Sequence, residues 1–233
     1  MEGFDPLALL AKPEYVALFA HGLEMTFVIA AGSWLLGMLV AVLLLAGRMT
    51  ASRPLGIFVS AYISYHRNVP TLVQLMLWYF GIASLLPDGV QEWLGDHDGE
   101  LVFAVIGLGL CQAAYFSEDL RSGLRSVPPG QADAARALGH GFVSSLRFVL
   151  FPQALRNALP ALISHTVSLF KNSSLAMAIG ATELTHAVKE VESASFRTFE
   201  TFLVGTLIYL GCSLLLMGSG ALLARRLRAA GAH

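Results

Sequence analysis

The chain has 233 residues, of which 55% are hydrophobic and only 13% are charged, and its mean hydropathy is +0.64. Soluble domains carry about 25% charged residues, so this composition argues against a soluble protein and indicates an integral membrane protein. The net charge of −1 gives no reason to expect a nucleic-acid partner. Cys111 and Cys212 lie in apolar runs without metal-ligand spacing, so we expect no metal site.

In chain order, residues 1–20 carry prolines and mixed charges and are expected to form a short flanking helix. A membrane helix needs about 17–25 mainly apolar residues. The apolar runs predict an all-α membrane protein with five spans, at about residues 23–47, 55–87, 101–120, 154–182 and 199–224. Because the residue before Pro70 avoids helical angles, we expect a break near residues 68–70, between an interfacial helix and the crossing. Lys171 interrupts the fourth run, for which a re-entrant loop stays open.

Basic residues orient the spans, because Lys and Arg accumulate on the inner side of a membrane. With the N-terminus outside, the inner segments hold ten basic residues and the outer segments three. The loop 88–100, with five acidic residues and no Lys or Arg, then lies outside. The inner residues are Arg48, Arg53, Arg121, Arg125, Arg136, Arg147, Arg156, Arg225, Arg226 and Arg228. We therefore predict that the N-terminus lies outside and the C-terminus inside.

The largest inner loop, residues 128–152, has the pattern of a helix-turn-helix. Proline is tolerated in the first turn of a helix, so Pro128-Pro129 is expected to precede a helix over Gln131–Leu138 that ends at Gly139 and Gly141. A second helix, Phe142–Leu150, is expected to stop at Pro152. The first helix is rich in alanine and too short to be stable alone, so we expect it to dock on a partner.

This loop resembles the signature loop of ABC-importer permeases, Glu-Ala-Ala, three residues, Gly, nine residues, Ile-x-Leu-Pro. Here it reads Asp133-Ala134-Ala135, then Gly139, then Val149-Leu150-Phe151-Pro152, with every spacing kept. Residues from about 60 to 185 are similar to polar amino-acid permeases, most of all to the glutamate/aspartate members. The resemblance implies that a coupling helix docks on a cytoplasmic ATPase through Gln131, Asp133, Ala134, Ala135, Leu138 and Gly139. The alternative is an ordinary loop helix that packs on its own protein.

The resemblance also implies a multi-pass subunit of the bacterial inner membrane, in an ATP-driven importer for polar amino acids, with glutamate and aspartate favoured. The chain has no phosphate-binding loop, so it is not itself an enzyme and binds no cofactor; ATP would be hydrolysed by a separate ATPase dimer. The other expected partners are a second permease, more readily a paired homologue than an identical copy, and an extracytoplasmic substrate-binding protein. A self-contained secondary carrier or channel and a membrane-embedded enzyme are the alternatives.

Polar residues inside the spans are costly and therefore mark candidate positions on the solute path. Lys171, Asn172, Ser173 and Ser174 interrupt the fourth span, Thr71 and Gln74 share one face of the second with Trp78, and Arg67 precedes the expected break. Packing between helices, or an interfacial anchor for the two cations, is the alternative. Gln112 and His165 are interpreted as packing groups, and Glu183 as the solvated end of the fourth span.

Overall fold

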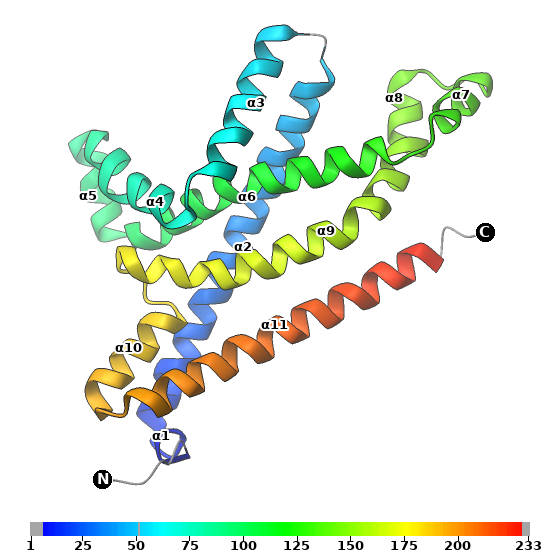
Figure 1. Ribbon diagram of the computed structural model, residues 1–233. Helices are drawn as coiled ribbons and strands as arrows, with labels where there is room; N and C mark the ends of the chain where they lie inside the picture. The colour runs from blue at the N-terminus through cyan, green and yellow to red at the C-terminus, as the bar shows by residue number, and fades with distance from the viewer. Residues whose placement is uncertain (1–6, 51, 230–233) are drawn as a thin grey trace.

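The computed structural model describes residues 7–50 and 52–229, and this part of the chain is built of helices without strands (Figure 1). Three helices are long and apolar enough to cross a membrane, namely α2 (Pro13–Met49), α6 (Gly99–Arg125) and α11, over Thr198–Leu227 of its range Thr198–Ala229. A bent helix pair is a fourth candidate if it is counted as one span. Long apolar helices are thus confirmed, whereas the count of five spans and their orientation stay predictions.

The helix that contains the first expected span begins at Pro13, ten residues before residue 23. After the single turn α1 (Leu7–Leu10), α2 starts at Pro13 and continues for 37 residues, which corresponds to about 55 Å. The prediction of a separate flanking helix over residues 1–20 was wrong for residues 13–20. Pro13 begins the long helix because a proline in the first turn forgoes no intrahelical hydrogen bond.

The break in the second expected span is confirmed. Helix α3 (Arg53–Asn68) ends with Val69 in an extended conformation, and α4 (Thr71–Met76) leaves at a bend of 110°. The chain then winds through a π-helical turn, η1 (Leu77–Ile82), and a 3₁₀ turn, η2 (Ala83–Leu85). The side chain of Gln74 stabilises the bend, because its Nε2 donates to the carbonyls of His66 and Val69 at 3.1 and 2.7 Å.

Helix α6 is the centre of the fold. It follows the short helix α5 (Asp88–Asp96) and lies between α2 and α9 (Phe151–Asn172), with α11 alongside α9 (Figure 1). At the loop end α6 and α9 come so close that a Cβ on Gly123 would lie 2.3 Å from the carbonyl oxygen of Ala154. Only glycine fits there, so the crossing of these two helices is determined by this contact.

The loop between α6 and α9 contains α7 (Pro129–Ala137) and α8 (Phe142–Ser145). The expected stop at Pro152 was wrong, because α8 continues through a π-helical turn, η3 (Leu146–Leu150), directly into α9. Pro152 is the second residue of α9, and its missing N–H removes one hydrogen bond to the preceding turn. The wider π-helical turn accommodates this loss, so the helix continues unbroken.

The polar residues after Lys171 end the α-helix, as the interruption of the fourth run predicts. Helix α9 stops at Asn172, and the chain continues as a 3₁₀ helix, η4 (Ser173–Ile179), which ends at Gly180 with φ 92°. Helix α10 (Leu184–Ser195) then packs against α2 and α11. This short helix connects the first and last long helices at the end of the molecule opposite the α7 loop (Figure 1).

Candidate functional site

A cavity of about 270 Å³ with both polar and apolar walls lies between α4, α6 and α9. Its walls carry hydroxyl, amide, imidazole and thiol groups together with two leucines. The lining residues are Thr71, Leu108, Cys111, Gln112, Tyr115, His165, Ser168, Leu169 and Asn172. We call this space the central cavity. It joins Thr71 of the second expected span to Asn172 of the fourth, two residues that the sequence proposed for the solute path.

Gln112 lines the central cavity and has an amide nitrogen that is unpaired within the described part of the chain. Its side chain is buried, yet its amide nitrogen Nε2 has no hydrogen-bond partner among the described residues. A buried donor without a partner costs about 1–3 kcal/mol, and such groups in native proteins require an explanation. The interpretation of Gln112 as a satisfied packing group was wrong. Nε2 itself is enclosed by protein, so the rest of the side chain, and not this donor, lines the cavity.

His165, which the sequence suggested to be a packing group, lines the cavity and is also hydrogen-bonded to the neighbouring helix. Its Nδ1 lies 2.6 Å from Oδ2 of Asp119, a buried residue of α6. The ring of Tyr115 lies 5.1 Å from the imidazole ring, and the guanidinium of Arg67 lies 5.7 Å from the centre of the same tyrosine ring. Arg67, an expected path residue, is thus close to the wall of the cavity but does not line it.

Two other expected path residues are engaged in the packing. Gln74 is buried, and its Oε1 lies 2.5 Å from Nδ1 of the buried His66. Ser173 is also buried and donates its hydroxyl hydrogen to the carbonyl of Phe170 at 2.6 Å. In this conformation neither side chain faces a cavity. Gln74 stabilises the bend between α3 and α4, and Ser173 stabilises the start of η4.

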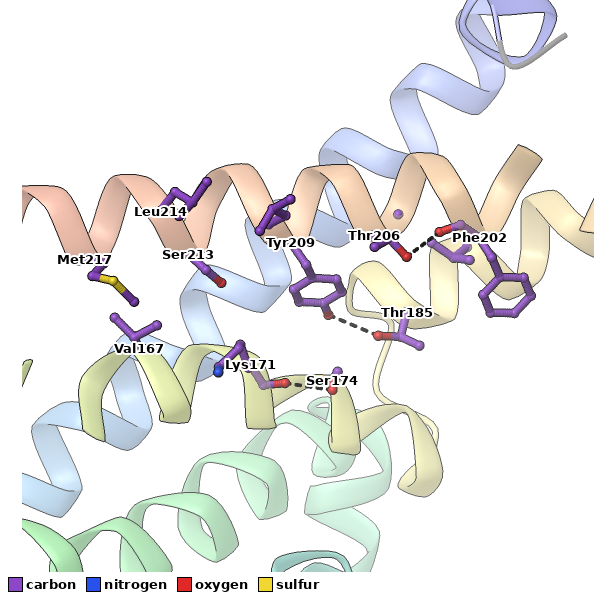
Figure 2. A pocket seen from close by; sticks show the side chains of 13 residues that line it. Val167, Lys171, Ser174, Thr185, Phe202, Thr206, Tyr209, Ser213, Leu214 and Met217 are labelled. Atoms are coloured by element: carbon purple, nitrogen blue, oxygen red, sulfur yellow. Dashed lines mark hydrogen bonds between the residues drawn. The ribbon is translucent and has the colours of Figure 1, made fainter. Parts of the chain in front are cut away.

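Lys171 and Ser174 face a different space, a groove of about 540 Å³ that we call the α11 groove. Figure 2 shows both residues opposite Tyr209 and Ser213 of α11. Consecutive helical residues point about 100° apart, so Lys171 and Asn172 diverge into the α11 groove and the central cavity. The four polar residues 171–174 therefore do not form one site.

Glu183 is fully buried, so its interpretation as a solvated end was wrong. Its carboxylate caps α10, accepting from the backbone N–H groups of Thr185 and His186 at 2.9 and 3.1 Å, and it also accepts from the hydroxyl of Tyr209 at 2.6 Å. The hydroxyl of Thr26 in α2 extends this hydrogen-bond network by accepting from the N–H of Leu184 at 3.1 Å. These bonds connect α2, α10 and α11, so Glu183 has a structural role here.

The α7 loop ends its first helix at a glycine and leaves large apolar side chains exposed. Gly139, at φ 84°, ends α7 with the N–H of His140 bonded to the carbonyl of Ala135 and its own N–H bonded to Arg136, the paired pattern of a glycine C-cap. Ala135 is buried against the protein, whereas Leu138 is 81% exposed. Large apolar side chains stay exposed nearby, at Phe142, Val143 and Phe148.

The polar residues of the α7 loop are weakly engaged. Asp133 lies 3.7 Å from Arg136, and both side chains are mostly exposed, so the pair contributes little to stability. Gln131 accepts from Gln153 of α9 at 3.2 Å, which places the start of α7 beside α9. Ala135 is thus buried within the chain, whereas the other five predicted docking residues are exposed.

The charge cluster at the end of α6 contacts α2 rather than the loop. Glu118 pairs with Arg48 of α2 at 3.0 Å and with Arg121 one turn further along α6. Asp119, which the sequence places beside Glu118, points instead to His165. Among the described residues, no group of three or more His, Cys, Asp or Glu side chains is placed to hold a metal ion.

The chain is similar to known permeases over most of its length. It is 29% identical over 213 residues to the arginine transport system permease protein ArtQ of Bacillus subtilis (strain 168), covering 91% of this chain and 94% of ArtQ. It is 30% identical over 221 residues to the glutamate/aspartate import permease protein GltJ of Escherichia coli (strain K12), covering 93% and 90%. A crystal structure described as an amino acid ABC transporter with histidines superposes with a TM-score of 0.83 at 30% identity, covering 96% of this chain and 99% of that one.

The expected resemblance to ABC-importer permeases is thereby confirmed, and the apolar helices are the membrane-embedded part of such a subunit. The model of one family matches residues 20–229. The chain belongs to the family described as the binding-protein-dependent transport system inner membrane component.

Proposed function

We propose that this chain is the membrane-spanning subunit of an ATP-driven importer for polar amino acids, and that the central cavity holds the amino acid during transport. The cavity between three helices, with hydroxyl, amide and imidazole groups on its walls, carries this proposal. The cavity volume of about 270 Å³ is near the lower limit of ligand sites, about 300–1,000 Å³. Such a volume suits a small solute rather than a peptide or a lipid.

We propose glutamate and aspartate as the preferred substrates. Asn172 offers an amide donor, and Tyr115 and Ser168 offer hydroxyl groups, in a cavity whose neighbouring carboxylate, Asp119, is already paired with His165. Arg67 adds a positive charge behind Tyr115. Relatives bear the names of both glutamate/aspartate and arginine permeases, so the choice rests on these cavity residues. A cavity without a free carboxylate disfavours a cationic side chain.

The α7 loop is proposed to dock on a cytoplasmic ATPase of a separate subunit. Its exposed apolar residues, with Leu138 and Phe142 among them, lie at one end of the molecule and suit a protein partner better than water. In the proposed orientation this end is cytoplasmic and the N-terminus lies outside. A second permease, preferably a paired homologue, and an extracytoplasmic binding protein would complete the importer in the bacterial inner membrane.

Reconstitution tests the proposal against a self-contained secondary carrier. The chain would be purified with its partner permease and ATPase, placed in vesicles with the binding protein, and tested for uptake of labelled amino acids. We expect glutamate uptake that requires ATP on the ATPase side and the binding protein on the other side. Uptake by this chain alone, driven by an ion gradient, would instead establish a secondary carrier.

A further inference from the structure

Asp119 and His165 form a hydrogen-bonded pair at the wall of the central cavity. Asp119 comes from α6 and His165 from α9, and Oδ2 of the aspartate lies 2.6 Å from Nδ1 of the histidine. The two partners differ in exposure, since 10% of the Asp119 side chain is accessible but 34% of the His165 side chain. The aspartate is thus buried behind the histidine, and the histidine lies at the surface of the cavity.

This arrangement determines how the imidazole meets a solute. A carboxylate accepts hydrogen bonds, so the Nδ1 facing Asp119 carries a hydrogen and donates it. The other ring nitrogen, Nε2, has no partner among the described residues, while the ring lines the cavity. Asp119 therefore fixes the orientation of the ring and leaves Nε2 available to a bound solute.

Asp119 is buried, and its partner is a basic side chain. An ionised carboxylate taken out of water needs an opposite charge close by, and His165 is the one basic side chain bonded to Asp119 among the described residues. The other charged or titratable side chains around the ring are Tyr115, and Arg67 behind it. An imidazole that carries hydrogens on both ring nitrogens would present Nε2 as a second hydrogen-bond donor.

We propose that Asp119 and His165 act as a specificity pair, in which Asp119 orients a protonated His165 so that Nε2–H binds the side-chain carboxylate of an acidic amino acid. This inference rests on the proposed function, because it assigns the central cavity to the substrate. Asn172, two turns further along α9, also lines the cavity and offers a second donor from its amide group. Two donors on one face of α9 match the two oxygens of a carboxylate.

The test measures ligand binding to the purified complex of permeases and ATPase without the binding protein, so that the selectivity of the binding protein does not enter. Glutamate and glutamine are compared by calorimetric titration, because they differ at the side-chain end alone. A hydrogen bond to a charged group is stronger than one to a neutral group. Asp119→Asn and His165→Gln are each expected to lower the glutamate-to-glutamine affinity ratio by about tenfold or more, which is about 1.4 kcal/mol.

Three further variants separate a specificity role from a structural one. The double variant Asp119→Asn/His165→Gln should lose no more selectivity than either single variant, since partners that act as a unit are not additive. Asp119→Glu keeps the charge and should retain more selectivity than Asp119→Asn. Thr166→Val is the matched control, because it removes the 3.0 Å hydrogen bond from Trp34 at the neighbouring position of α9 but does not line the cavity. It should leave the ratio unchanged.

The outcomes distinguish this inference from the function on which it rests. If the reconstituted importer transports glutamate but the variants bind glutamate and glutamine in the wild-type ratio, the specificity pair is refuted while the transport function stands. The pair is also refuted if both affinities fall equally, because a packing defect does not discriminate between the two ligands. A wild-type complex that neither binds nor transports an acidic amino acid refutes the pair and the proposed substrate together.

Discussion

Replacement of Gly139 by valine tests whether the α7 loop couples this subunit to an ATPase. Gly139 adopts φ 84°, which glycine occupies freely but other residues rarely adopt. A Cβ added there meets no atom within 4 Å. The substitution therefore strains the backbone at the end of α7 without any clash within the chain.

The free-energy cost of this strain is small and falls on one short helix. A left-handed conformation costs a residue with a Cβ about 1–2 kcal/mol, and more for a β-branched side chain. This cost falls on α7, a helix of nine residues with Ala135 as its buried residue. The loop can relax by losing its cap without disturbing α2, α6 and α9. We thus expect Gly139→Val to be inserted and folded but to present α7 wrongly, with ATPase affinity reduced by about tenfold or more.

Gly141 provides a matched control two residues away. Its Cβ would also meet no atom within 4 Å, but its φ is −70°, which valine adopts without strain. Co-purification of the ATPase and ATP turnover stimulated by the binding protein should be lost in Gly139→Val, partly kept in Gly139→Asn and kept in Gly141→Val. Asparagine is the intermediate case because it tolerates the left-handed conformation. If Gly139→Val binds the ATPase and turns over ATP like the wild type, the loop is an ordinary one.

Three further predictions concern the membrane part. A cysteine placed in the loop 88–100 should react with an impermeant reagent from outside intact cells, and reaction after permeabilisation alone would reverse the proposed orientation. Gln74→Leu removes the bonds to His66 and Val69, so thermal unfolding should show a loss of about 2–4 kcal/mol; an unchanged midpoint would mean that the bend does not depend on this side chain. Asn172→Leu, which fills the central cavity, should reduce uptake by about tenfold or more, whereas Ser174→Leu in the α11 groove should reduce it less, and the reverse order would place the solute path in that groove.

The features that could be predicted from the sequence are those that depend on one residue or on one uninterrupted apolar run. The apolar runs predicted membrane helices, since burial in lipid requires little beyond length and composition. The bend before Pro70 and the cap at Gly139 were predicted because proline and glycine restrict or relax the backbone at their own positions. The resemblance of residues 128–152 to the permease signature loop was visible because its residues keep their spacing within one loop.

Which polar side chains contact one another depends on how the helices pack, and this could not be predicted from the sequence. Asp119 and His165 are 46 positions apart, and their pairing depends on the rotation and crossing of α6 and α9, which close contacts such as that of Gly123 with Ala154 determine. The same rotation separates Lys171 from Asn172 and buries Gln74 and Ser173. Glu183 was misjudged because its position at the end of an apolar run predicts exposure, whereas α2, α10 and α11 converge on it. A polar residue in a membrane helix is therefore conspicuous in the sequence, but the face on which it lies, and its partner, are set by the packing of neighbouring helices.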